Sequence, residues 1–342
     1  MIRTRFVALV CVSALWLGCG GKSPGPGPTP TGDPPRISCP ADVSVTGVAV
    51  PQQAVTFAAP TVTDGTSPVS VTCSPASGAA FPLGNSAVSC TASDARSRAA
   101  SCSFNVTLKG FAIGVTKYLA FGDSVTEGQN GQRFGVTRII DSPNAYPTKL
   151  QSLLDASFPG QGVSVINRGS GGEFIEAALA RLPAIMAAER PGAVLLIDGY
   201  NNLLRDCPAD PGPRPACIDA IEFVAGKLRE CARTARSGGA AHVFVATLTP
   251  PGPYVPTPGY DNRRIDGSAI TKLNARIKSQ LPAEGAIIVD VHALFLGHEA
   301  EFTGPDGLHL FPPGNQAMAD AFFAAIRATI PQTPALTSPG AR

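Results

Sequence analysis

Short apolar runs alternate with longer amphipathic stretches through the last two thirds of the chain. The apolar runs predict strands at 117–122, 162–167, 193–198, 241–247 and 286–290. The stretches between and after them predict helices at 144–157, 173–189, 217–236, 264–280 and 313–329. Because strands and helices alternate, we expect an α/β fold with a five-stranded parallel sheet covered by helices on both faces. About 215 residues are ample for one buried core of this kind.

Residues 36–109 carry a different pattern, in which short runs of Val, Thr and Ser are separated by turn residues. Residues 43–45, 69–72 and 104–107 are examples. Alternation with a period of two residues predicts strands, so we expect a small all-β sandwich here. The segment contains no grouping of side chains suited to catalysis.

The first 19 residues have the pattern of a signal peptide. Arg3 and Arg5 precede an apolar run over residues 6–17, which as a helix would span only about 18 Å and is too short to cross a bilayer. The run ends in Leu-Gly-Cys, which resembles a bacterial lipoprotein cleavage site with Cys19 as the lipidated residue. We therefore expect an extracytoplasmic lipoprotein held to the membrane through Cys19, with simple secretion as the alternative.

Two further segments have the composition of connectors rather than of a core. Gly and Pro dominate residues 20–35, which predicts a linker that is either a semi-extended tether or an unstructured spacer. Residues 331–342 follow the last predicted helix, and we expect them to form a C-terminal tail.

Two motifs nearly two hundred residues apart supply the groups of a catalytic triad. Ser124 follows the first strand of the α/β region in a Gly-Asp-Ser turn, at the sheet edge where open α/β folds place their sites. Two residues separate Asp306 from His309, so one turn can bring both side chains to the same side. Each motif alone is compatible with an ordinary turn. Together they provide a nucleophile, a base and a carboxylate that orients the base.

Two more strand ends offer hydrogen-bond donors for an oxyanion. The second strand runs into a Gly-rich turn at 168–172, and such turns expose backbone N–H groups to anions. Gly169 is the candidate donor in this turn. The third strand is followed by Gly-Tyr-Asn-Asn, where the side-chain amide of Asn201 is the second candidate.

These four motifs, in this order, resemble those of the SGNH hydrolases, also called GDSL esterases and lipases. The resemblance covers 115–330 and implies a three-layer αβα fold of flavodoxin type. It also implies roles: Ser124 is the nucleophile, His309 the base and Asp306 its partner. The backbone N–H of Ser124, Gly169 and Asn201 would form the oxyanion hole. One position departs from the family, because Asn202 stands where many members have Asp.

The N-terminal β region resembles the hyalin repeat (HYR), an immunoglobulin-like extracellular module. The resemblance rests on Ile-Ser-Cys-Pro at 37–40, Pro-Thr-Val-Thr-Asp at 60–64, Phe-Pro-Leu-Gly at 81–84 and Cys-Ser-Phe at 102–104. It implies adhesion or spacing rather than chemistry.

The nine cysteines divide according to these segments, and two of them, Cys11 and Cys19, belong to the predicted signal peptide. Four lie in the β region, where two disulfides are plausible in an oxidising compartment although their connectivity is open: Cys39, Cys73, Cys90 and Cys102. Cys207 and Cys217 flank a Pro-rich loop and can form a third bridge. Cys231, on a predicted helix, is expected to be a buried free thiol.

Charge and composition limit the classes of partner and cofactor that we expect. The formal net charge of +2 is too small to indicate a nucleic-acid partner. His242, His292 and His298 lack the spacing of metal ligands, so we expect neither a metal nor a cofactor. The expected substrate is an ester, such as one on an acetylated polysaccharide or a lipid. A lipase or lysophospholipase, an acyltransferase of the same fold and an inactive scaffold that serves in adhesion are the alternatives.

Overall fold

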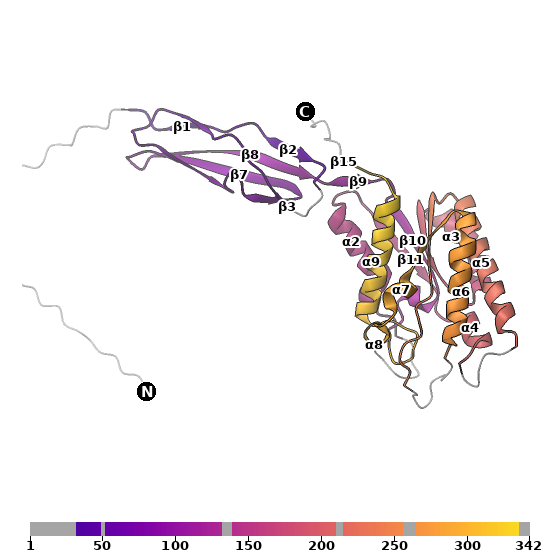
Figure 1. Cartoon of the computed structure of the whole chain (residues 1–342). Coiled ribbons are helices and arrows are strands. Elements are labelled where there is room, and N and C mark those ends of the chain that lie inside the picture. The colour runs from indigo at the N-terminus through magenta and orange to yellow at the C-terminus, as the bar shows by residue number, and fades with distance from the viewer. Residues whose placement is uncertain (1–31, 49–51, 132–138, 210–214, 256–263, 335–342) are drawn as a thin grey trace, which may run out of the picture.

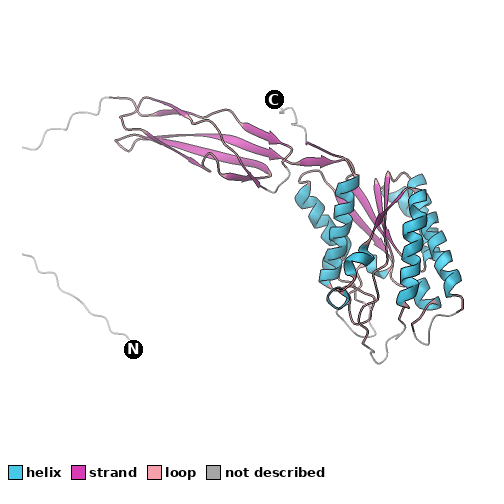
Figure 2. Cartoon of the chain, viewed as in Figure 1, coloured by secondary structure: helices cyan, strands magenta, loops and turns pink. Residues whose placement is uncertain are grey.

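The computed structural model describes residues 32–48, 52–131, 139–209, 215–255 and 264–334. An elongated β-rich unit is followed along the chain by a unit in which helices flank a sheet (Figure 1). Figure 2 shows the same division by secondary structure, with all the helices drawn in the second unit.

The α/β unit is built on a five-stranded sheet in which all strands are parallel. Its strands are β10 (Lys117–Gly122), β11 (Ser164–Gly169), β12 (Ala193–Ile197), β13 (His242–Ala246) and β14 (Ala286–Val289). They are arranged in the order β11-β10-β12-β13-β14. The chain therefore reverses its direction of winding between β10 and β12. In open α/β sheets this switch point is where ligands bind, beyond the carboxyl ends of the strands.

Helices cover both faces of the sheet. They are α2 (Tyr146–Ser157), α3 (Ile175–Glu189), α5 (Cys217–Ser237), α6 (Gly267–Gln280) and α9 (Pro312–Thr329). Helices α2 and α9 pack together on one side, and α3, α5 and α6 pack in sequence on the other (Figure 1). The expected three-layer fold is confirmed, and each predicted strand and helix lies within three residues of its predicted ends.

The core follows from the composition of the strands. Every residue of β12 is buried, because an inner parallel strand has helices on both faces and must be apolar throughout. On one face the ring of Tyr146 stacks on that of Phe322, with centroids 5.3 Å apart, which joins α2 to α9. The strands are thus enclosed between two layers of helices, and the loops at their carboxyl ends extend from this packed core.

Short elements join these parts. They are the helices α1 (Ser124–Glu127), α4 (Tyr200–Asp206), α7 (Val291–Phe295) and α8 (Glu299–Phe302), and the 3-10 turns Ser142–Asn144 and Leu281–Glu284. Helices α1 and α4 start directly after β10 and β12, so both begin at the switch point.

In the part of the N-terminal unit that the structure describes, all regular elements are strands. Its main sheet has the order β2-β8-β7-β5, formed by β2 (Val43–Thr46), β8 (Ala99–Lys109), β7 (Gly84–Ser93) and β5 (Ser70–Ser74). Two small pairs join β1 (Arg36–Ser38) to β4 (Thr61–Thr63) and β3 (Gln52–Ala54) to β6 (Ala80–Pro82). Disulfides Cys39–Cys102 and Cys73–Cys90 supply the connectivity that the sequence left open.

A two-stranded ribbon lies between the two units. Strand β9 (Phe111–Ile113) pairs in antiparallel fashion with β15 (Gln332–Pro334), so part of the expected C-terminal tail returns to the junction. The side chain of Gln161 holds β9 from the α/β unit, because it donates to the carbonyl of Phe111 and accepts from the N–H of Ile113. Both ends of the α/β unit are therefore fixed at one place.

Candidate active site

Ser124 lies at the carboxyl end of β10, at the switch point of the sheet. The turn before it requires glycine: Gly122 has a φ of +155°, and a Cβ there would come 1.9 Å from the carbonyl oxygen of Ile197. Asp123 then caps α1, with its Oδ1 accepting from the N–H of Val125 at 3.0 Å. This strand-to-helix turn presents Ser124 at the start of α1, with only 4% of its surface exposed.

Asp306 and His309 share one tight turn. The Oδ1 of Asp306 accepts from the backbone N–H groups of Leu308 and His309, at 3.0 and 2.9 Å. Its Oδ2 lies 2.6 Å from Nδ1 of His309. One carboxylate thus closes the turn and orients the imidazole.

The turn brings His309 onto Ser124. Nε2 of His309 lies 2.8 Å from Oγ of Ser124, across 185 residues of sequence. Because Asp306 accepts at Nδ1, the neutral ring carries its proton on that nitrogen and presents the lone pair of Nε2 to the hydroxyl. Burial raises the pKa of Asp306, but the hydrogen bonds and charge of His309 and the backbone donors outweigh it and hold the pKa below its ordinary value. Asp306 is therefore an anion at neutral pH.

Gly169 does not have the role expected of it. Its N–H donates to Oδ1 of Asn167 at 2.9 Å, and the Nδ2 of Asn167 in turn donates to the carbonyl of Thr126 at 2.8 Å. A Cβ on Gly169 would come 2.1 Å from the backbone nitrogen of Glu127. Glycine is required here so that β11 can pack against α1, and its N–H is already used.

Gly172, three residues further along the same turn, borders the cavity next to Ser124. Its φ is +77°, and its N–H has no hydrogen-bond partner among the described residues. The sequence contains three glycines within four residues, and nothing in it distinguishes the one that packs from the one that faces the cavity. Asn201 borders the same cavity and uses one amide N–H on the carbonyl of Glu173, at 2.9 Å. A second amide proton is left for a ligand.

The cavity has a volume of about 590 Å³, which suits a small organic ligand. Its wall combines the apolar side chains of Leu204, Ile265, Ile270 and Leu308 with the polar ones of Gln129, Thr249 and Arg264. The start of the Pro-rich loop that follows β13 also contributes through Pro250, Pro251 and Gly252, whereas residues 256–263 of that loop lie outside the described part.

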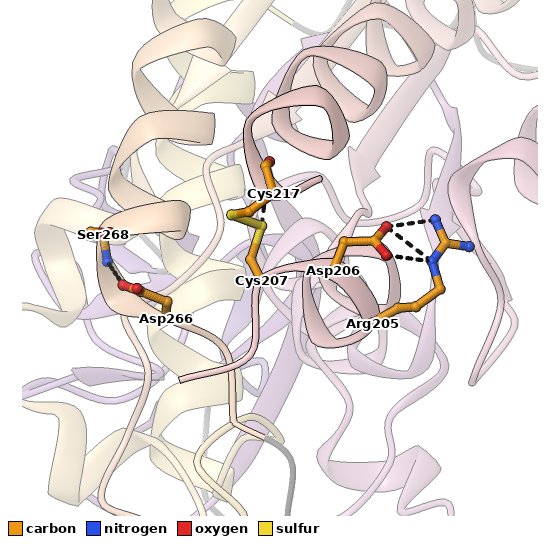
Figure 3. Close-up of a disulfide and its surroundings, with 6 residues drawn as sticks. All are labelled: Arg205, Asp206, Cys207, Cys217, Asp266 and Ser268. Atoms are coloured by element: carbon orange, nitrogen blue, oxygen red, sulfur yellow. Dashed lines mark hydrogen bonds and ion pairs between the residues drawn. A yellow bond between two sulfur atoms is a disulfide. The ribbon is translucent and has the colours of Figure 1, made fainter. Parts of the chain in front are cut away.

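The disulfide Cys207–Cys217 holds a segment that contributes Ala209 to this wall. It joins the end of α4 to the start of α5 (Figure 3). The segment after α4 pairs with the segment before α6 through the backbone: the N–H of Asp266 donates to the carbonyl of Cys207 at 2.9 Å, and the N–H of Ala209 donates to that of Arg264 at 2.7 Å. Asp266 also caps α6 through Ser268, as Figure 3 shows. The predicted bridge is confirmed, and Cys231 is the buried free thiol expected.

Comparison with known families agrees with this geometry. The model of the GDSL-like lipase/acylhydrolase family matches residues 120–317, more than half of the chain, and the match includes Ser124 and His309. The chain belongs to this family. It is therefore a hydrolase of ester bonds.

The β-rich unit and the fold have relatives as well. The HYR domain model matches residues 32–108. A lipase/acylhydrolase from Enterococcus faecalis is 21% identical with a TM-score of 0.47, covering 63% of this chain and 97% of its own. An acetylxylan esterase from Geobacillus stearothermophilus is 21% identical with a TM-score of 0.46, covering 63% and 95%. At this identity the likeness concerns the fold alone, and no curated protein matches the chain.

The departure at Asn202 has a structural explanation. Asn202 is fully buried, and its Oδ1 accepts from the N–H of Ile175 at 3.0 Å, which an Asp could also do. Its Nδ2 donates to Oε2 of Glu176 at 3.0 Å, which an Asp could not. The amide therefore matches the acidic residue in the first turn of α3, and it joins α4 to α3 rather than facing Ser124.

Other sequence-based expectations concern regions away from the triad. Cys19, the signal peptide and most of the Gly/Pro linker lie outside the described residues. In the ranges that are described, no group of three or more His, Cys, Asp and Glu could hold a metal ion. Over the same ranges, no helix has the length and hydropathy of a membrane span.

Proposed function

We propose that the protein is an extracellular serine esterase that cleaves carboxylic esters through an acyl-serine intermediate. The observation that carries the proposal is the continuous chain of hydrogen bonds from Asp306 to His309 to Ser124, at 2.6 and 2.8 Å. Three disulfides and the HYR match support the extracellular location. Attachment to the membrane through Cys19 remains a prediction.

The proposed reaction has two steps of acyl transfer. His309 takes the proton of Ser124 while Oγ attacks the ester carbonyl, and the resulting imidazolium is stabilised by the anionic Asp306. The proton then passes to the departing alcohol as the tetrahedral intermediate collapses to an acyl-serine. A water molecule, activated by His309 in the same way, releases the acid.

The proposed oxyanion hole consists of the N–H groups of Ser124 and Gly172 and the side-chain amide of Asn201. Gly172 replaces Gly169 in this role, because the N–H of Gly169 is bound to Asn167. All three proposed groups border the cavity. Donors that are fixed in advance need no reorganisation when the charge develops, which is the main contribution of such sites.

For the substrate, we propose a short-chain ester, such as an acetyl ester, on an extracellular carbohydrate. A cavity with both apolar and hydrogen-bonding side chains suits the rings and hydroxyls of sugars. An extracellular β module next to the enzyme is compatible with a polymeric substrate.

Hydrolysis of p-nitrophenyl acetate, butyrate, octanoate and palmitate tests the proposal, with Ser124→Ala as the matched inactive variant. We expect activity that falls with chain length and disappears in the variant, together with fluorophosphonate labelling of the native protein only. Activity that rises toward palmitate would indicate a lipase. If the native protein is no more active than Ser124→Ala on any of these esters, the proposed enzymatic function is contradicted. Product analysis with an added alcohol would reveal an acyltransferase.

A further inference from the structure

Two carboxyl groups lie next to each other beneath the proposed nucleophile. Gly122 on β10 is opposite Ile197 on β12, so Asp123 and Asp198 are the next residues of two paired parallel strands. Both are fully buried, with 0% of their surface exposed. Neither was singled out by the sequence, where Asp123 is part of a turn motif and Asp198 ends an apolar run.

Each carboxyl group has one satisfied oxygen and one orphan. Oδ1 of Asp123 accepts from Val125, and Oδ1 of Asp198 accepts from Gly199 at 2.6 Å. Among the described residues, neither Oδ2 of Asp123 nor Oδ2 of Asp198 accepts a hydrogen bond of normal geometry, and both atoms are buried. The backbone N–H of Tyr200 is the other group near Asp123, and it lowers the pKa of that carboxyl without offsetting its burial. Buried carboxyl oxygens are rarely left unpaired, since the lost hydration is not replaced.

The surroundings do not neutralise two negative charges. The ionisable groups that interact with the pair are Glu173, Arg181, His309, Tyr146, Tyr200 and Cys231. Arg181 is the only permanent cation among them, and its guanidinium is bound to Glu173 at 2.7 Å and lies over the ring of Phe121. Burial raises the pKa of Asp123 to about 6, and burial together with the adjacent charge of Asp123 raises the pKa of Asp198 well above its ordinary value.

We propose that Asp198 carries a proton and donates it from Oδ2 to Oδ2 of Asp123, so that one hydrogen bond satisfies both orphan atoms. The bond would tie the end of β10 to the end of β12. Ser124 follows Asp123, and Asn201 lies three residues after Asp198, so the bond fixes the nucleophile relative to an oxyanion donor. Asp198 is thus a positioning residue. This role rests on the proposed esterase function, whereas the presence of the proton on Asp198 is independent of that function.

The shared proton makes the site sensitive to alkaline pH. When the proton leaves, two buried anions repel each other, and the two loops move apart. A displacement of about 1 Å costs on the order of a hundredfold in rate. We therefore expect kcat, more than KM, to fall on the alkaline side of the profile.

Infrared difference spectroscopy of the whole protein tests the proton directly. At about pH 8 ordinary carboxyl groups are ionised, so the carbonyl stretch of a neutral carboxylic acid should come from this pair. We expect the band in the native protein and in Asp320→Asn, an exposed control on α9, and its loss in Asp198→Asn. Absence of the band in the native protein, or its persistence in Asp198→Asn, would overturn the proposal whether or not any ester is hydrolysed.

Kinetics test the positioning role. Asn at position 198 keeps a donor for Asp123 but cannot titrate, so Asp198→Asn should retain kcat within about threefold and lose the alkaline decline. Asp198→Leu has a similar shape and no donor, and it should lose about a hundredfold in kcat at every pH. Native kinetics in Asp198→Leu, or an unchanged alkaline limb in Asp198→Asn, would refute the role. If Asp198→Leu does not fold, the comparison of Asp198→Asn with the native protein still decides.

Discussion

Removing the disulfide Cys207–Cys217 should weaken both the stability of the α/β unit and its affinity for substrate. The bridge closes a loop with a sequence separation of 10 residues, for which chain entropy gives about 2.7 kcal/mol. In a unit of this size that corresponds to a fall in Tm of about 5 to 10 °C. Both sulfurs are buried, so the double variant Cys207→Ala/Cys217→Ala avoids an unpaired thiol at the site.

The kinetic effect follows from where the bridge lies. It holds the segment that pairs with residues 264–266, and Ile265 and Arg264 form part of the cavity wall. Asp306, His309 and Ser124 are on other segments and keep their mutual hydrogen bonds. We therefore expect KM to rise several-fold while kcat changes by less than about threefold.

The assay is thermal unfolding together with hydrolysis of p-nitrophenyl acetate. The double variant Cys73→Ala/Cys90→Ala is the matched control, because it removes a bridge from the β-rich unit and should leave KM unchanged. A Tm and a KM equal to those of the native protein in Cys207→Ala/Cys217→Ala would refute the reasoning. A fall in kcat as large as the rise in KM would show that the bridge acts on the triad instead.

The remaining predictions concern single residues of the site. Asn201→Ala should lower kcat by about a hundredfold or more, measured on p-nitrophenyl acetate, since a lost oxyanion donor costs about 3 to 4 kcal/mol. Asp306 has a lowered pKa in the folded protein, so its contribution to stability is complete above about pH 4 and is lost as the pH falls through the folded value; Tm against pH should therefore be flatter in acid for Asp306→Asn, and a parallel profile would contradict this. Asn202→Asp should cost about 1 to 3 kcal/mol of unfolding free energy, because it places a buried carboxylate against Glu176, and Glu176→Gln should restore most of it; no loss in chemical denaturation would count against the explanation. Arg264 borders the cavity, and its guanidinium lies 5.1 Å from the centroid of the Tyr254 ring. Arg264→Gln should therefore lower kcat/KM for mono-p-nitrophenyl glutarate about tenfold relative to the neutral butyrate, and equal losses on both esters would refute charge recognition.

The framework of the α/β unit could be predicted because its buried strands are continuous apolar runs. Residues 193–197 are all apolar and all buried, and the pattern of each major helix matches one covered face of the sheet. The short helices α1 and α4 were not predicted, since four and seven residues contain too little periodicity to recognise. Their positions follow from the sheet, which supplies the strand ends where they start.

The sequence was sufficient to predict which three side chains meet at the site, but not which glycine borders the cavity. Ser124, Asp306 and His309 are residue types with few other uses in this arrangement, and the structure brings them within hydrogen-bond distance. Gly169 and Gly172 differ in backbone conformation and in which neighbours approach them: Gly172 has a positive φ and open space around it, whereas Gly169 lies against the backbone of α1. That difference depends on the packing of β11 against α1, which is a contact between distant segments and leaves no local signal.

The ribbon between β9 and β15 has a consequence for how the α/β unit can be handled as a part. Ile113 is opposite Gln332, so the chain enters and leaves the unit at neighbouring positions. A unit whose ends adjoin can be transplanted into a surface loop of another protein, or given new termini elsewhere after its present ends are joined, without stretching its backbone. The α/β unit can in that sense be moved as one piece, with the two paired strands of the ribbon marking where it would be cut and rejoined.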